Sequence, residues 1–249
     1  SGAADCLASF MALKFPGKWD WYSKIEFILG LYEPGTSVVC KRYVKPRMQV
    51  VDVGANVGYF SLLFSKLVGP KGRVYAFEPH PQLFRLLKYN TERCRNVTPV
   101  EKAVLNSNGV IDFYLSTRSR SHGLHVPEGF IDAVVKVEAV SLDGFLGNLH
   151  SQFVKIDVEG TEPLVLEGMK SLIEKARELM IICEYNPTAL RLNGHDPGDF
   201  LQVLQSKFEA VYRIDEKNGS LSLIKGLSLV REVPEWDSVN LLLCKGREI

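Results

Sequence analysis

Short apolar runs alternate with amphipathic segments over much of the chain. The apolar runs predict strands at Gln49–Val53, Arg73–Phe77 and Val97–Val104. Apolar residues at helical spacing predict helices between them, at Gly58–Leu67 and Leu83–Cys94. An order of strand, helix, strand, helix, strand is typical of a parallel sheet with right-handed crossovers.

A polar stretch, Ser116–Gly129, interrupts this alternation, and strands are predicted on both sides of it, at Val110–Leu115 and Ala133–Ala139. The parallel pattern then resumes. Further strands are predicted at Phe153–Val158, Leu179–Tyr185, Ala210–Ile214 and Val239–Cys244, and further helices at Pro163–Met169 and Asp199–Lys207. A turn signal at residues 217–220 and irregular chain join the last two strands, so we expect one antiparallel strand in the sheet.

The first 48 residues carry a different pattern. Aromatic and aliphatic residues from Trp19 to Leu31 predict one amphipathic helix, which Pro34 and Gly35 end. We therefore divide the chain into an N-terminal helical lead-in, residues 1–45, and a main domain, residues 46–249, with an insertion near 105–140. The predicted fold class is α/β, a doubly wound, Rossmann-like sheet that is mostly parallel with an antiparallel last strand.

Composition narrows the class of protein. The 249 residues are 46% hydrophobic and 24% charged with a net charge of +1, which is typical of a globular domain and gives no reason to expect nucleic-acid binding. The longest apolar run, Leu179–Cys183, is too short to span a membrane. The five cysteines are widely spaced without a C-x-x-C pair, and no signal peptide is apparent, so we expect a cytoplasmic protein. Because the chain opens at Ser1 without Met, we expect residues to precede it.

The loop after the first strand, Asp52 to Gly58, has the composition of a ligand-binding turn. Gly54 permits a sharp turn, Gly58 permits close approach at the helix start, and Asn56 tolerates a left-handed backbone. With Ala55, these small residues let a cofactor lie against backbone N–H groups. Glu78 ends the second strand, where an acidic side chain accepts hydrogen bonds from ribose hydroxyls in such folds. The loop and the glutamate together predict a nucleoside site; the alternative is a doubly wound domain with an empty crevice.

The type of nucleoside follows from the glycine spacing and from charge. A dinucleotide site usually contains G-x-G-x-x-G, and the third glycine is absent here. Carboxylates fall at or near strand ends; they are Asp52, Asp157, Glu159 and Glu184. Negative charge of this kind repels a pyrophosphate and attracts the sulfonium cation of S-adenosylmethionine. The residues therefore favour S-adenosylmethionine over NAD.

Four motifs in order carry a resemblance to a known family: Asp52-Val53-Gly54-Ala55-Asn56-Val57-Gly58, Phe77-Glu78-Pro79, Lys155-Ile156-Asp157-Val158-Glu159-Gly160 and Glu167-Gly168-Met169. Over about residues 45–245 the chain resembles the FkbM family of S-adenosylmethionine-dependent methyltransferases. The resemblance implies the class I methyltransferase fold, a seven-stranded sheet whose last strand is antiparallel. It also implies O-methylation of a hydroxyl on a small molecule or glycan. Two alternatives remain, an NAD(P)-dependent oxidoreductase and a non-catalytic module that keeps the fold.

The candidate catalytic residues are two carboxylates at the end of the fourth parallel strand. Asp157 and Glu159 lie in the crevice where open α/β sheets bind ligands, and they share one face if the strand continues. The resemblance implies that Asp157 lies near the sulfonium and the acceptor, and Glu159 is a candidate general base. Alternatively, Glu159 caps the helix that begins near Glu162.

Further candidates surround these two carboxylates. Pro79, Lys102 and Ala103 are further candidates for cofactor binding, and by analogy with relatives the last two are expected to lie against the adenine. Glu184 and Asn186 end the next strand; with Asp157 they could hold Mg²⁺, but we favour polar lining of the crevice for the acceptor. His122, in the polar insertion, is a weaker candidate for acceptor binding. The sequence carries no signal for the oligomeric state.

Overall fold

The computed structural model describes residues 13–16, 29, 31–116, 122–147, 151–235 and 237–246. The helix predicted from Trp19 onward lies almost wholly outside these residues. None of the helices in the described part has the length and apolar composition of a bilayer span.

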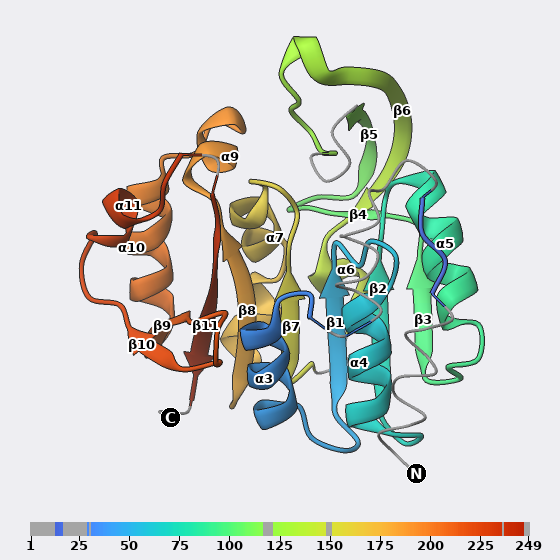
Figure 1. Ribbon diagram of the computed structural model, residues 1–249, viewed down its shortest axis with the longest axis horizontal. Coiled ribbons are helices and arrows are strands. Elements are labelled where there is room, and N and C mark those ends of the chain that lie inside the picture. The colour runs from blue at the N-terminus through green and yellow to red at the C-terminus, as the bar shows by residue number, and fades with distance from the viewer. Residues whose placement is uncertain are drawn as a thin grey trace.

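The main feature is an eight-stranded, mostly parallel sheet (Figure 1). Its strands are β1 (Gln49–Val53), β2 (Arg73–Phe77), β3 (Val97–Val100), β7 (Phe153–Ile156), β8 (Leu179–Tyr185), β9 (Ala210–Ile214), β10 (Leu221–Leu223) and β11 (Val239–Lys245). Their order is β10-β9-β11-β8-β7-β1-β2-β3, and β3, β2, β1, β7 and β8 pair in parallel. This order confirms the predicted doubly wound sheet.

The antiparallel part of the sheet is larger than predicted. β11 runs antiparallel to both β8 and β9, as expected for the last strand. A second antiparallel strand, β10, pairs with β9 at the sheet edge, so the sheet has eight strands instead of the seven that the resemblance implied. The turn at residues 217–220 explains the difference, because it folds the chain straight back along β9.

A small three-stranded sheet contains most of the predicted insertion. It consists of β4 (Ala103–Val104), β6 (Ile131–Val140) and β5 (Gly109–Ser116), in that order, and stands at the upper end of the large sheet in Figure 1. The prediction of one strand over residues 97–104 was wrong. The chain turns after Val100, where the N–H of Lys102 donates to the Val100 carbonyl, and β4 then pairs with β6 instead of β2.

Helices cover both faces of the large sheet. α3 (Pro34–Tyr43), α4 (Tyr59–Val68) and α5 (Pro81–Thr91) contribute to the apolar clusters on one face. On the other face lie α6 (Leu142–Leu146), α7 (Glu162–Gly168), α8 (Lys170–Lys175) and α10 (Pro197–Lys207). Two short helices, α9 (Pro187–Leu192) and α11 (Leu229–Glu232), and a 3₁₀ turn at Glu128–Phe130 complete the described elements.

Pro34 and Gly35, which were expected to end the preceding helix, begin another one, and the end of that preceding helix lies outside the described residues. Pro34 is the first residue of α3. Proline lacks an N–H and has a fixed φ, so it fits the first turn of a helix, where the N–H would have no partner within the helix. Gly35 is fully packed, because a Cβ there would lie 2.2 Å from the Asp215 carbonyl oxygen.

Alternation along β1 and β7 places two charged residues inside the protein. Val51 and Val154 pack into the core beneath α7, whereas Val50 and Phe153 pack into the core beneath α4. Asp52 and Lys155, two residues further along, face the α4 side and are opposite each other in the strand register. Both are buried. Burying two opposite charges in a sheet costs desolvation energy, so such a pair is expected to have a function. Both residues line the pocket described below.

Candidate active site

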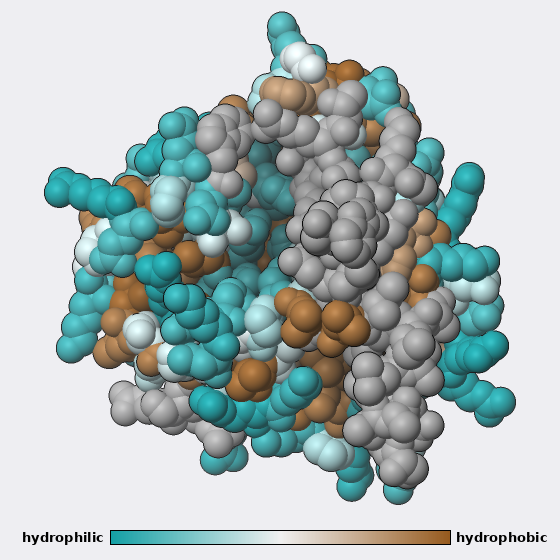
Figure 2. Space-filling view, in the orientation of Figure 1, coloured by the Kyte–Doolittle hydropathy of each residue, from teal (hydrophilic) through white to brown (hydrophobic). Residues whose placement is uncertain are grey.

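A pocket of about 570 Å³ lies beyond the carboxyl ends of β1, β2, β7 and β8. The space-filling view shows a hollow in this face with hydrophilic residues at its bottom (Figure 2). The predicted site residues that line the pocket are Asp52, Gly54, Ala55, Asn56, Glu78, Pro79, Lys102, Ala103, His122, Asp157, Glu159, Glu184 and Asn186. Gly58 does not line it.

Gly54 and Gly58 of the loop are each required to be glycine, but for different structural reasons. Gly54 has a φ of 80°, and a Cβ at this position would lie 1.8 Å from the Asp157 carbonyl oxygen. Gly58 has a φ of 97°, and a Cβ there would come within 3.0 Å of Leu87 on α5. Gly54 therefore allows β1 and β7 to converge at the pocket, and Gly58 allows α4 to begin against α5.

The expectation that loop N–H groups face a cofactor was wrong for most of the loop. The N–H groups of Gly54 and Ala55 both donate to the Phe77 carbonyl, at 3.0 and 2.9 Å. The N–H of Asn56 donates to the Glu78 carboxylate, and that of Gly58 donates to the Ala55 carbonyl. Since these donors are used within the protein, the loop offers a poor cradle for a pyrophosphate.

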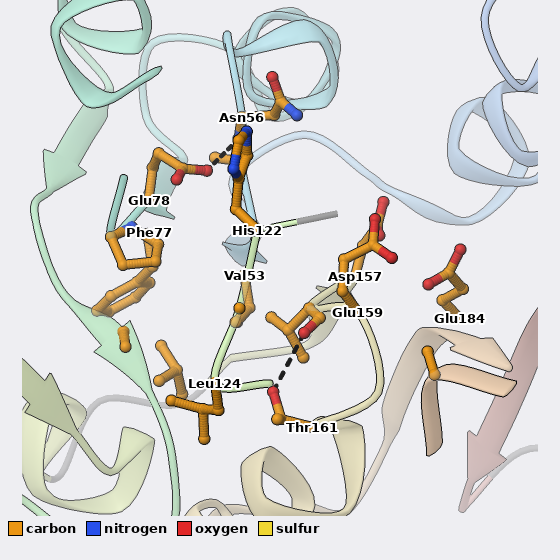
Figure 3. A pocket seen from close by; sticks show the side chains of 18 of the residues that line it. Val53, Asn56, Phe77, Glu78, His122, Leu124, Asp157, Glu159, Thr161 and Glu184 are labelled. Atoms are coloured by element: carbon orange, nitrogen blue, oxygen red, sulfur yellow. Dashed lines mark hydrogen bonds between the residues drawn. The ribbon is translucent and has the colours of Figure 1, made fainter. Parts of the chain in front are cut away.

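Glu78 is buried where β2 ends. Its Oε2 accepts from the N–H of Asn56 and its Oε1 from the N–H of His80, both at 2.8 Å. Burial raises the pKa of Glu78 to about 7, although these two hydrogen bonds oppose the shift. Each carboxylate oxygen can accept a second hydrogen bond, so Glu78 keeps acceptor capacity toward the pocket. Figure 3 shows it beside Asn56 at one side of the pocket.

Within the described part of the chain, three side-chain oxygen atoms of pocket-lining residues are buried without a hydrogen-bond partner. They are Oδ1 of Asn56, Oε2 of Glu184 and Oδ1 of Asn193. Buried acceptors of this kind usually have a partner, because leaving one unpaired costs about 1–3 kcal/mol. Asn56 also has a φ of 53°, an uncommon backbone conformation for a residue with a side chain. All three oxygen atoms fit a ligand that brings hydrogen-bond donors into the pocket.

Lys155 is the centre of a buried charge network. Only 2% of its side chain is exposed, and its Nζ donates to Asp157 Oδ2 at 2.7 Å. Burial alone would lower the pKa of Lys155, but the carboxylates of Asp157, Glu33 and Asp52 raise it above its ordinary value. The ammonium also lies 4.5 Å from the centre of the Phe60 ring. Lys155 is therefore a permanent cation among several carboxylates.

Asp52 accepts a hydrogen bond from a residue of α4. Ser61 Oγ donates to Asp52 Oδ2 at 2.6 Å. Burial raises the pKa of Asp52 to about 6, and the nearby Lys155 and the bond from Ser61 limit the rise. Asp52 is therefore mostly ionised at pH 7 and takes up a proton as the pH falls through about 6.

The backbone turns sharply after β7. The strand ends at Ile156, and Glu159 has a φ of 58°, so the expectation that Asp157 and Glu159 extend one strand face was wrong. Thr161 is the N-cap residue of α7. Just before this helix, the carboxylate of Glu162 accepts the N–H groups of Val158 and Gly160, each at 3.2 Å.

Glu184 and Asn186 have different environments at the end of β8. Burial and the carboxylates of Asp157, Glu159 and Glu162 raise the pKa of Glu184 well above its usual range. Asn186 Oδ1 accepts the N–H groups of Thr188 and Ala189 as the N-cap of α9, so its oxygen is already used. In the described part of the chain no three His, Cys, Asp or Glu side chains have the spacing of a metal site.

His122 reaches the pocket from the chain between β5 and β6. Its Nδ1 accepts the N–H of Ser116 at 2.9 Å, and its ring packs edge-on against His80 with centroids 4.5 Å apart. Burial, helped by His80, lowers the pKa of His122 to about 4, so the ring is neutral at pH 7. Figure 3 places His122 near Asn56, across from Asp157, Glu159 and Glu184.

Several pocket residues were not proposed as site residues from the sequence, and three of them are polar and lie beside the buried charges: Tyr32, Glu33 and Lys155. Tyr32 and Glu33 precede α3, and Lys155 lies within β7. The signal for Lys155 was present, because a charged residue interrupts an otherwise apolar strand. No comparable signal marked Glu33, whose neighbours in space come from the far end of the chain.

The sheet order, with an antiparallel β11 between β8 and β9, and a carboxylate-rich pocket at the ends of β1, β2 and β7 define a class I methyltransferase. A solved structure shares this fold: the precorrin-6y C5,15-methyltransferase of Geobacter metallireducens matches with a TM-score of 0.50 and 14% identity, covering 95% of each chain. The model of the methyltransferase FkbM domain matches residues 52–214. The chain belongs to the FkbM methyltransferase family, and its methyl donor is S-adenosylmethionine.

Two curated relatives match longer parts of the chain. The 2-O-methyltransferase NoeI of Sinorhizobium fredii is 26% identical over 209 residues, which are 75% of this chain and 84% of the relative. The hexuronic acid methyltransferase AglP of Haloferax volcanii is 30% identical over 157 residues, which are 61% of this chain and 59% of the relative.

Proposed function

We propose that this protein transfers a methyl group from S-adenosylmethionine to a hydroxyl group of a small molecule or glycan. The observation that carries the proposal is the buried carboxylate of Glu78, which ends β2 and faces a pocket with further carboxylates at the ends of β1, β7 and β8. A ribose diol needs a hydrogen-bond acceptor, which Glu78 provides at the end of β2. A sulfonium needs negative charge nearby, which the carboxylates at the other strand ends provide.

The methyl donor would be held mainly by residues at the ends of β1 and β2 and at the start of β4. Glu78 would accept the ribose hydroxyls, and the unpaired Asn56 oxygen would accept a further donor. Pro79, Lys102 and Ala103 would border the adenine. The rest of the donor molecule, with its sulfonium, would lie near Asp52, Asp157 and the small residues Gly54 and Ala55. Gly58 would act only indirectly, by packing α4 against α5. When bound, S-adenosylmethionine supplies an electrophilic methyl group.

The chain's own task is then to orient a hydroxyl and to receive its proton. Asp157 and Glu159 would face the reacting centre, and Glu184, Asn186 and His122 would contact the acceptor. Orientation of two reactants contributes several kcal/mol to catalysis, and a positioned base adds roughly 10²–10⁴-fold. The neutral ring of His122 suits hydrogen bonding to a polyol better than proton removal, because its pKa lies at about 4.

We infer a sugar hydroxyl as the acceptor from the names of two relatives taken together. A 2-O-methyltransferase supports transfer to an oxygen atom, and a hexuronic acid methyltransferase supports a sugar as the acceptor. We also propose a cytoplasmic location without a nucleic-acid partner. The described cysteines, Cys40, Cys94, Cys183 and Cys244, are all free thiols, which fits a reducing compartment, and the net charge is only +1.

The test uses S-adenosylmethionine labelled in the methyl group and a polar extract of metabolites and glycans. We expect the wild-type protein to transfer label into products that resist mild alkali, as methyl ethers do and methyl esters do not. Glu78→Gln should abolish most of the transfer, and the exposed Glu174→Gln should not. Wild-type protein that transfers no label, or label that is released by alkali, would refute the proposal.

A further inference from the structure

Glu33 holds an unusual backbone conformation at the pocket wall. It precedes α3 with a φ of 43° and a ψ of 63°, the left-handed region. Of the four non-glycine residues with positive φ in the described part of the chain, three line the pocket: Glu33, Asn56 and Glu159. Such conformations cost roughly 1–3 kcal/mol and concentrate at functional sites.

A hydrogen-bond network anchors this side chain to the far end of the chain. Asn240 on β11 donates through Nδ2 to Glu33 Oε2 at 3.0 Å, and the Tyr32 side chain provides a further hydrogen bond. The same Asn240 amide contacts Glu216 at 3.3 Å, and Glu216 in turn accepts from the backbone and the hydroxyl of Thr36. Glu33 is therefore fixed in place although it lies outside the region that the family model matches.

Burial and the charges around Glu33 bring the pKa of its carboxyl close to neutral pH. Burial raises its pKa to about 7; Lys155 opposes the rise, and the carboxylates of Asp157 and Glu216 add to it. A base with a pKa near the working pH is efficient, because it is ionised before the reaction and still binds a proton well.

Asp157 is less suited to receive a proton. Its Oδ2 is bonded to the buried Lys155 ammonium at 2.7 Å. A proton on Asp157 would remove the negative charge that faces this ammonium in a site with little water, and an unbalanced buried charge is costly. Asp157 therefore suits orientation and charge balance, whereas Glu33 accepts hydrogen bonds from an amide, that of Asn240, and from the side chain of Tyr32.

We propose that Glu33 is the general base that receives the proton of the acceptor hydroxyl. This inference rests on the proposed function. The hydroxyl oxygen forms a bond to the methyl carbon, the carbon–sulfur bond breaks with its electron pair going to sulfur, and the O–H proton goes to Glu33. The product carboxylic acid is neutral and returns the proton to water after product release.

The experiment measures initial rates of label transfer into the polar extract, at saturating donor, from about pH 5 to about pH 9. For the wild type we expect a rate that rises with pH and levels off above about pH 7. Glu33→Gln should lower the rate at high pH about 100-fold or more and remove the rising limb. Glu33→Asp should retain the limb at a reduced rate, and S-adenosylhomocysteine should bind both variants within about threefold of the wild type.

Two further variants separate catalysis from a structural role. Asn240→Ala removes a donor that stabilises the Glu33 carboxylate, so the rising limb should move to higher pH. Glu216→Gln perturbs the same network from outside the pocket and should keep a rising limb. Unfolding curves establish that each variant is folded; if Glu33→Gln is not, Glu33→Asp and Asn240→Ala carry the test.

Three results would overturn the inference. The first is a Glu33→Gln rate within about threefold of the wild type with an unchanged limb. The second is a loss of about tenfold or more in donor affinity with an unchanged rate at saturating donor, which would make Glu33 a donor-binding residue. The third is wild-type protein that transfers no label; this result refutes the proposed function itself, whereas the first two leave it standing.

Discussion

The carboxylate of Glu78 accepts a hydrogen bond of 2.8 Å from the backbone N–H of Asn56. This contact joins the end of β2 to the loop that follows β1, so the two sequence signals of the nucleoside site form one structural unit. The same bond takes up an N–H group that would otherwise be available to a phosphate. A nucleoside without a pyrophosphate therefore fits this site better than a dinucleotide does.

The role of Glu78 in donor binding can be measured without an acceptor. We expect Glu78→Gln to weaken binding of S-adenosylhomocysteine about 10- to 100-fold, or about 1.4–2.8 kcal/mol, because the amide nitrogen of glutamine cannot accept a hydrogen bond. Titration calorimetry gives the dissociation constant. The exposed Glu174→Gln, whose carboxylate lies 3.8 Å from Lys170, is the matched control. Equal affinities of both variants and the wild type would remove Glu78 from the site.

Gly54 and Gly69 give a matched test of the convergence of β1 and β7. Both have positive φ, 80° and 65°, but only a Cβ at Gly54 would overlap another atom. We expect Gly69→Ala to lower the free energy of unfolding by about 1 kcal/mol and Gly54→Ala by about 3 kcal/mol or more. Urea unfolding curves measure both values. Equal losses would show that the approach of Gly54 to the Asp157 carbonyl does not matter.

The preference for a sulfonium should depend on pH. The pKa of Asp52 lies at about 6 and that of Glu78 at about 7, both raised by burial, so these carboxyls lose protons as the pH rises from about 5.5 to about 8. Ionised carboxylates attract the cation of S-adenosylmethionine but not the neutral thioether of S-adenosylhomocysteine. We expect the affinity ratio of the first to the second ligand to increase about fivefold or more over this range. A ratio that stays constant or falls would contradict the assigned electrostatics.

Removing the buried cation should make stability depend on pH. Lys155→Met leaves Asp52 and Asp157 without their nearest positive charge, so we expect the free energy of unfolding to fall by about 3–5 kcal/mol at about pH 8. The loss should shrink toward about pH 5.5, because carboxyls whose pKa is raised in the folded state take up protons as the pH falls.

Chemical unfolding at the two pH values measures this dependence. Lys155→Met combined with Asp157→Asn should regain part of the lost stability, since one of the unbalanced charges is then absent. A larger loss at the lower pH, or a double variant no more stable than the single one, would argue against the network around Lys155.

Local patterns predicted the parts of the fold that local contacts determine. The boundaries of β1, β2, β8 and β9 were predicted correctly, because each is a short, mostly apolar segment with turn or helix residues on both sides. The break after Val100 was missed because it depends on β6, a strand that comes later in the chain and pairs with β4. No pattern within residues 97–104 marks that change of sheet.

In the site, too, the residues marked by local sequence were predicted, whereas those that depend on contacts between distant parts of the chain were missed. The loop after the first strand and Glu78 together predicted a nucleoside site, and Gly54, Ala55 and Asn56 of that loop line the pocket with Glu78, since they belong to adjacent strand–helix units. Glu33 was missed because its partners, Asn240 and Glu216, are distant in sequence and meet it only in the folded protein. Proline after Glu33 was also interpreted as a helix end, whereas it is a helix start.

The central claim is that the pocket holds an adenosyl group with a sulfonium and no pyrophosphate. Titration calorimetry of the wild-type protein with S-adenosylhomocysteine and, separately, with NADH tests it most directly. We expect S-adenosylhomocysteine to bind with one site per chain and NADH to give no binding heat. Binding of NADH without binding of S-adenosylhomocysteine would contradict the account.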